Sequence, residues 1–128
     1  MVVLTLMGVL LSLAAPSFQR AFEQARADVA VANLKAIWVA ERAYWLENRA
    51  YTADLSVLQS LDLIDSSILA DSSPYAYSVS WADESVLAVT AARRGSDVWT
   101  GAFAIDQSGL VTGSIQADGS AAILPSTL

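Results

Sequence analysis

The sequence predicts an α+β fold in which one long, protruding N-terminal helix packs its second half against an antiparallel sheet of three to five strands. The helix is indicated by residues 17–48, which contain no Gly or Pro and place alanines and charges at helical spacing. The sheet is indicated by alternating segments between residues 75 and 124 that are separated by turn signals. The 128 residues suit one subunit, divided into an apolar stalk half-helix at residues 1–25 and a head at residues 26–128.

The stalk begins with 19 uncharged residues, and the first charge is Arg20. Its large apolar side chains include Val3, Leu4, Leu6, Met7, Leu10, Leu11, Leu13 and Phe18, and Phe22 follows. Leaving such a helix in water would cost about 15 kcal/mol or more, as much as a whole domain's stability. We therefore expect lipid or other chains to cover it.

Three interpretations of this segment compete. A cleaved signal peptide is disfavoured because no basic residue precedes the run and Pro16 follows the only small-residue pair, Ala14-Ala15. A plain membrane anchor is short of the roughly 20 apolar residues that a span requires. The third interpretation is a helix that waits in a membrane and then packs against identical helices.

The predicted helix from Met1 to Asn48 would be about 72 Å long, far longer than a head of some 80 residues. Its first half must protrude. Gly8 and Pro16 are its weakest points, because Pro16 removes a backbone donor and Gly8 lowers helix propensity. In an assembly this segment would lose its hydrogen bonds, or it would remain a kink in a continuous helix.

Two apolar stripes follow the second half of the helix. One stripe holds Phe22, Ala25, Val29, Ala32, Ala36, Val39 and Ala43, and the other holds Val31, Leu34, Trp38 and Trp45. Val29, Leu34, Trp38 and Trp45 are thus candidates for packing on the head or on another subunit. Either one stripe packs on the sheet and the other on a neighbouring subunit, or both stripes belong to the chain's own core.

The head is expected to begin where Asn48-Arg49-Ala50 ends the long helix. Thr52 or Asp54 caps a short helix through about Leu61, and an exposed loop runs from Asp62 to Pro74. Strands are predicted at 75–81, with Tyr75, Tyr77, Val79 and Trp81 on one face, and at 85–92, 98–105, 110–115 and 121–124. Arg93-Arg94-Gly95-Ser96-Asp97 is expected to be a turn, and Asp118-Gly119 is a hairpin signal.

The amino-acid composition excludes most kinds of catalytic and metal-binding site. Without Cys or His there is no disulfide, thiol nucleophile, imidazole base or usual zinc site. No phosphate-binding or nucleophile motif occurs, so we predict no enzyme, no catalytic residue, no cofactor and no metal. Asp62, Asp65 and Asp71, or Asp97 and Asp118, offer oxygens to calcium, but they lack a fixed loop pattern.

The charge is divided between two halves. Residues 1–49 hold five basic and four acidic side chains, whereas residues 50–128 hold nine acidic side chains against Arg93 and Arg94. A net charge of −7 on the second half makes nucleic acid an unlikely partner, although the two arginines can make a local contact.

The segment from Met1 to Phe18, with its Pro16-Ser17-Phe18 step, resembles the N-terminal helix of bacterial type IV pilins and type II secretion pseudopilins. Glu41–Leu55, where a glutamate and aromatics precede Asn48-Arg49-Ala50-Tyr51, is similar to the family's helix exit, and Phe103–Gly113 resembles a common pilin hairpin. Family members start with a basic leader and a short segment that would join to Met1. We therefore expect such residues to precede this sequence.

The resemblance implies a structural subunit that polymerises with itself, through its apolar helix, into a helical filament outside the cell. It also implies the inner membrane, a prepilin peptidase and the pilus or secretion assembly machinery as partners. Alternatives are a pseudopilin that drives export, a minor pilin that binds DNA or a surface at a filament tip, and, more remotely, a membrane-anchored enzyme. Many pilins close their C-terminal region with a disulfide, so here the hairpin after Asp106 must hold by pairing and packing alone.

Overall fold

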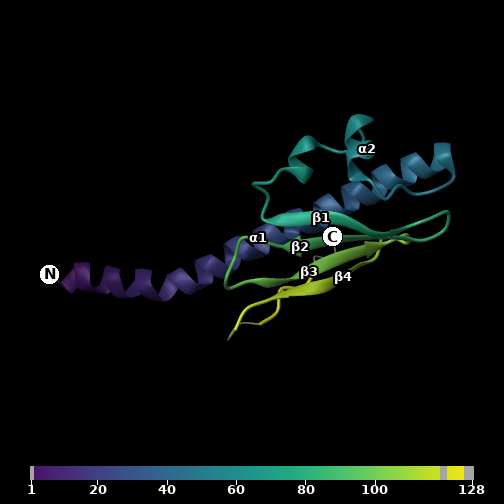
Figure 1. The fold of residues 1–128 in the computed structure, drawn as a ribbon. Coiled ribbons are helices and arrows are strands. Elements are labelled where there is room, and N and C mark those ends of the chain that lie inside the picture. The colour runs from purple at the N-terminus through teal and green to yellow at the C-terminus, as the bar shows by residue number, and fades with distance from the viewer. Residues whose placement is uncertain (1, 119–120, 126–128) are drawn as a thin grey trace.

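The computed structural model describes residues 2–118 and 121–125, and it describes side chains from residue 18 onward. It has an α+β architecture in two layers, a long helix against an antiparallel sheet, as the sequence predicted. Figure 1 shows the helix running well beyond the head at its N-terminal end.

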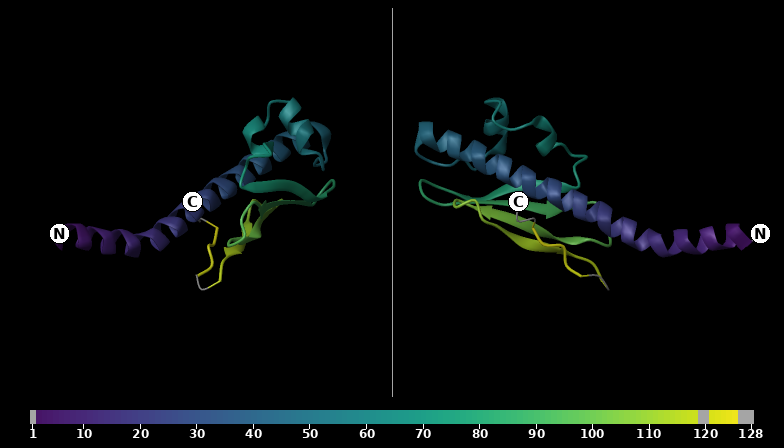
Figure 2. Two further views of the ribbon diagram at one scale, coloured as in Figure 1. Left: turned by 60° about the vertical axis from the view of Figure 1, so that its left-hand side comes forward. Right: turned by 180° about the vertical axis from the view of Figure 1, so that it is seen from behind.

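Helix α1 is continuous from Val2–Asn48, through both Gly8 and Pro16. Figures 1 and 2 show a gentle bend between its free N-terminal part and the part that lies on the sheet. The helix ends where expected, because Arg49 takes a left-handed conformation with φ of 57° and its N–H donates to the Trp45 carbonyl at 2.7 Å.

Two short helical segments follow beside the C-terminal end of α1. Helix α2 spans Leu55–Ser60, and its N-cap is Asp54, whose side chain accepts a hydrogen bond from the Ser56 N–H. The 3-10 helix η1 spans Ser66–Leu69 and is capped in the same way by Asp65. We expected only a loop at η1. Buried Ile68 holds this turn against the core.

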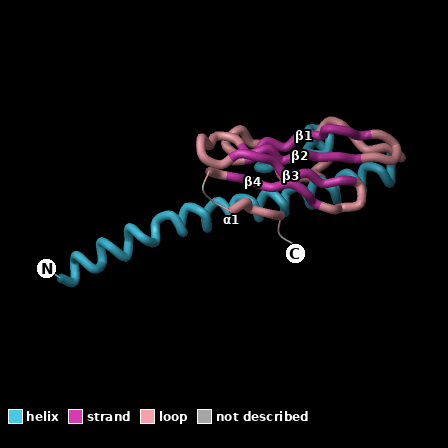
Figure 3. Tube along the Cα trace, turned by 90° about the horizontal axis from the view of Figure 1, so that it is seen from below, coloured by secondary structure: helices cyan, strands magenta, loops and turns pink. Residues whose placement is uncertain are grey.

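The sheet contains four strands in the order β1-β2-β3-β4, all antiparallel to their neighbours. Their bounds are β1 Tyr75–Ala82, β2 Leu87–Arg93, β3 Thr100–Asp106 and β4 Val111–Gln116. Figure 3 shows them side by side above the second half of α1. The predicted strand at 121–124 is reduced to one bridge, in which Ile123 and Ile115 exchange two backbone hydrogen bonds.

Trp81 does not share the face of Tyr75, Tyr77 and Val79, contrary to the expectation from strict alternation. The register shifts between Val79, which faces Val89, and Trp81, which faces Ala88. This irregularity turns Trp81 to the opposite face, where its side chain is 60% exposed.

The core lies between α1 and the inner face of the sheet. From α1 it takes Ala27, Ala30, Val31, Leu34, Ile37 and Ala40, and from the strands Tyr75, Leu87, Val89, Ala91, Phe103, Ile105 and Ile115. Gly101 and Gly113 allow β3 and β4 to pair, since a Cβ on either would lie 2.3 or 2.2 Å from a carbonyl oxygen of the partner strand.

Candidate functional site

One face of α1 is apolar and uncovered by the chain's own head. Phe22, Val29 and Val39 are 62%, 59% and 59% exposed. We name this face the apolar stripe, and it consists of Phe22, Ala25, Val29, Ala32, Ala36 and Val39, all exposed. Ala43, expected at its end, is half-buried. The apolar stripe therefore does not belong to the chain's own core, and the alternative that both stripes of the helix are internal is wrong.

The other stripe faces the sheet. Leu34 and Val31 are buried in the core. Trp38 and Trp45 are half-buried, and each donates its indole N–H to a carbonyl in a hairpin turn, Trp38 to Gln107 at 3.0 Å and Trp45 to Glu84 at 2.8 Å. The two tryptophans thus fasten the β3–β4 and β1–β2 turns to one side of α1.

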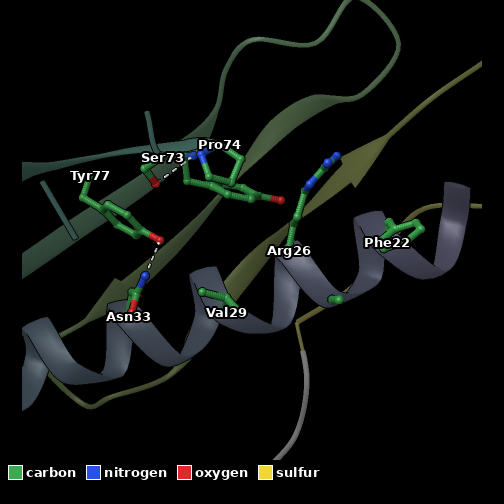
Figure 4. A pocket seen from close by; sticks show the side chains of 9 residues that line it. Phe22, Arg26, Val29, Asn33, Ser73, Pro74 and Tyr77 are labelled. Atoms are coloured by element: carbon green, nitrogen blue, oxygen red, sulfur yellow. Dashed lines mark hydrogen bonds between the residues drawn. The ribbon is translucent and has the colours of Figure 1, made fainter. Parts of the chain in front are cut away.

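A groove opens between the apolar stripe and the start of β1. Its volume is about 320 Å³. Phe22, Ala25 and Val29 form the wall on α1, and Pro74, Tyr75 and Tyr77 form the wall on the strand side (Figure 4). Asn33 closes one end by donating its side-chain N–H to the Tyr77 hydroxyl at 3.0 Å. The lining is therefore largely apolar, with its polar groups at the ends.

An ion pair that the sequence analysis missed lies next to the groove, where Glu23 adjoins the lining residue Arg26. Glu23 is fully buried on α1, and its carboxylate accepts from Arg93 Nε at 2.6 Å and from Arg93 Nη2 at 3.2 Å. The Arg93 side chain is only 5% exposed, so this pair is buried. Arg26, which lines the groove, donates a hydrogen bond of 3.2 Å to the same carboxylate, and its side chain is half exposed. The buried contacts of α1 thus begin three residues before the expected start of the head at residue 26.

Two tyrosines border this cluster and the groove. The Tyr75 hydroxyl is buried without a hydrogen-bond partner, and burial, with the neighbouring Glu23 carboxylate, raises its pKa above the ordinary value. Burial also raises the pKa of Tyr77, while its hydrogen bond from Asn33 acts in the opposite direction. Both phenols stay protonated at neutral pH.

Of the turn predicted at residues 93–97, Arg93 lies in a strand instead, and both Arg93 and Arg94 bind other segments of the head. Arg93 ends β2 and also donates to the Pro74 and Arg94 carbonyls. Arg94 donates to the Ser73 carbonyl at 2.8 Å and to the Ala70 carbonyl at 2.7 Å. These hydrogen bonds occupy the groups that a phosphate contact would need.

Glu41 is the second buried acid that the sequence analysis did not predict. One of its oxygens accepts the Thr52 N–H at 3.0 Å, and the other is buried without a partner. Burial raises the pKa of Glu41 to about 7, although the Thr52 hydrogen bond lowers it. A helical pattern of alanines and large apolar residues around positions 23 and 41 is the signal that both lie on the sheet side.

The other residues expected at a site are placed as follows. Phe18 is 62% exposed on the free part of α1. The side chains of Val3, Leu4, Leu6, Met7, Gly8, Leu10, Leu11, Leu13 and Pro16 lie outside the described part, as do Met1 and Gly119. In the portion of the chain described, no helix is long and apolar enough to span a bilayer.

Acidic side chains do not gather into a metal site among the described residues, where no three of them stand close enough to hold one ion. The loop aspartates instead cap the backbone. Asp83 accepts from the Ser85 and Val86 N–H groups, and Asp106 accepts from the Ser108 and Leu110 N–H groups. The pKa of Asp83 is lowered chiefly by the hydrogen bond from the Trp81 indole N–H, and that of Asp106 chiefly by the hydrogen bond from the Ser108 hydroxyl, with these backbone N–H groups adding to both.

Comparison of the sequence with protein-family models and with curated proteins found no match.

Proposed function

We propose that this chain is a structural subunit, similar to type IV pilins, that polymerises through its N-terminal helix into an extracellular helical filament. One observation carries the proposal most directly. The uncharged part of α1, residues 2–19, extends away from the head (Figure 2), and the apolar stripe continues along the same helix with its side chains exposed.

Exposure of the uncharged segment and of the apolar stripe to water is unfavourable. A second copy carries the same two surfaces, so contact between copies would bury them. A helix that projects from one side of a subunit makes a head-to-tail contact, and such contacts build open fibres when the rotation between copies does not close. The acidic head, with a net charge of −7 over residues 50–128, would then face water. Before assembly, the inner membrane would hold the apolar segment.

A binding role for nucleic acid is less well supported. The arginines that would contact phosphate are tied to Glu23 and to backbone carbonyls in the head. The two remaining roles, a pilin of a long surface filament and a pseudopilin of a short export fibre, differ in filament length. The following experiment also measures that length.

The proposal predicts that Leu10→Asp abolishes assembly, because a carboxylate in the uncharged segment would be buried without a partner. The measurement is electron microscopy of material sheared from cells that express the chain, with Leu110→Asp as the control. Leu110 is an apolar residue 60% exposed on the head. Normal filaments of Leu10→Asp would refute the proposal, whereas long cell-surface filaments of the unaltered chain would distinguish a pilus from a short export fibre.

A further inference from the structure

We propose that the groove between α1 and β1 holds an anionic phospholipid, with an acyl chain along the groove and the phosphate at Arg26. The inference rests on the proposed function in one respect, which is that a membrane holds segment 2–19 before assembly. Figure 4 shows Arg26 and Val29 on α1, with Pro74 on the opposite side of the groove.

Two hollows of different character share the Arg26 side chain. The groove, of about 320 Å³, is lined mostly by apolar and aromatic side chains. A second hollow, of about 460 Å³, adjoins it and is lined mostly by charged and hydroxyl side chains, which are Arg26, Asp71, Ser72, Ser73, Arg93 and Arg94. We name it the polar hollow. Arg26, Ser73 and Pro74 line both. A ligand that spans this shared wall must therefore have an apolar body and a polar head.

The charges around the polar hollow favour an anionic head. Arg26, Arg93 and Arg94 contribute three positive charges. Asp71 in the lining and Glu23 beside it contribute two negative charges, so the net charge is +1. Arg26 makes one hydrogen bond among the described residues, through Nη1 to Glu23, and its side chain is 50% exposed. Its other N–H groups are therefore available to a phosphate, which a guanidinium binds well.

A buried polar group without a partner borders the groove. Tyr75 lines the groove and is 1% exposed, and its hydroxyl has no hydrogen-bond partner in the described part of the chain. The Arg93 guanidinium lies 5.8 Å from the centre of its ring, so the phenol belongs to the same cluster of charges. A buried hydroxyl without a partner is unfavourable, and it can donate to an ester or phosphate oxygen of a lipid that enters the groove.

The position of the groove along α1 favours a membrane lipid over a free anion. The uncharged run ends at residue 19, and Phe22 is the first residue of α1 that lines the groove. Arg26 lies about 10 Å beyond residue 19 at 1.5 Å per residue. The headgroup layer of a bilayer is about 5–8 Å thick on each side. A membrane that holds segment 2–19 therefore brings its phosphates within reach of the Arg26 side chain.

The test is the retention of lipid by the full-length chain in neutral detergent, measured by native mass spectrometry. The chain is offered equal amounts of phosphatidylglycerol, which is anionic, and phosphatidylcholine, which is zwitterionic. Phosphatidylglycerol should be retained in preference, and an excess of inorganic phosphate should not displace it, because phosphate leaves the groove empty. Equal retention of the two lipids would overturn the proposal. Displacement by phosphate would also overturn it, because the site would then be one for free phosphate.

Two matched pairs of variants locate the lipid. Arg26→Gln should lower the retention of phosphatidylglycerol about fivefold, the effect of one basic residue at an anionic lipid surface. Arg42→Gln removes the same charge from an exposed site of α1 outside the groove and should not lower it. Val29→Gln should lower retention by a similar factor and Val39→Gln should not, since both valines are 59% exposed on the apolar stripe but only Val29 of the two lines the groove. Equal losses within either pair would overturn the proposal.

These measurements separate the lipid site from the proposed function, because they require no filament. The Glu23–Arg93 pair remains in Arg26→Gln, so the head should stay folded. Unselective retention of lipid, together with filaments that Leu10→Asp abolishes, would overturn the lipid site and leave the proposed function standing. Selective retention that depends on Arg26 and Val29 would support the lipid site even if the chain formed no filament.

Discussion

The buried carboxyl of Glu41 makes the stability of the head depend on pH in a direction opposite to that of most acids. Its pKa is about 7 in the folded chain, against an ordinary value of 4.5, because burial disfavours its charged form. Between these two pH values the folded state binds more protons at this site than the unfolded state does. The free energy of unfolding therefore falls as pH rises through this window.

The magnitude follows from the difference in pKa. About 2.5 pH units at 1.36 kcal/mol each correspond to a loss of about 3 kcal/mol, complete once pH exceeds the folded pKa. Below pH 4.5 the site is neutral in both states and contributes no pH dependence. The capped aspartates, whose pKa values are lowered, act in the opposite sense at lower pH.

The substitution Glu41→Gln removes this dependence while it keeps an oxygen that can accept the Thr52 N–H. We expect the difference in unfolding free energy between variant and unaltered chain to shift by about 3 kcal/mol in favour of the variant from pH 4.5 to pH 8. Urea unfolding followed by tryptophan fluorescence, in neutral detergent at a series of pH values, measures it. Taking the difference cancels the aspartates, which both chains share.

Glu47→Gln is the matched control, because Glu47 lies on the same helix with an exposed side chain. A flat difference for Glu41→Gln across the whole range would refute the reasoning, since it would mean that the carboxyl gains enough water or charge compensation to ionise normally.

Two further predictions concern the cohesion of the head. Glu23→Gln should lower the unfolding free energy by about 3–5 kcal/mol, because it leaves Arg93 buried and unpaired, whereas Asp28→Asn at an exposed site of α1 should change it little. Chemical denaturation of both variants measures this, and equal stabilities would contradict a structural role for the pair. Gly113→Ala should disrupt the β3–β4 pairing, because its Cβ would lie 2.2 Å from a carbonyl oxygen of β3, while Gly95→Ala has open space and should cost only about 1–2 kcal/mol for its positive φ. Amide exchange across β4 should rise sharply in the first variant alone, and protection equal to that of the unaltered chain would show that the strands pair without this glycine.

Local patterns were enough to predict the helix, its end and most strands. The run without Gly or Pro predicted α1 to Asn48, and Asp54 was one of two expected caps for α2. The bounds of the four strands differed from the prediction by at most two residues, because alternation does not mark where a hydrogen-bonded ladder begins. Trp81 was misplaced for a different reason, since an irregularity in pairing inverts a face without leaving a sign in the alternation itself.

The sequence by itself determined the contrast between an uncharged segment at residues 1–19 and an acidic second part at residues 50–128, because charge and hydrophobicity are properties of each residue that need no partner. Only the tertiary structure decided which stripe of α1 is covered, that Glu23 and Arg93 form a buried pair across 70 positions, and that Glu41 is cut off from water. The physical reason is that burial and ion pairing depend on segments distant in the chain. The sheet covers one side of α1, and the apolar stripe is the side it leaves open.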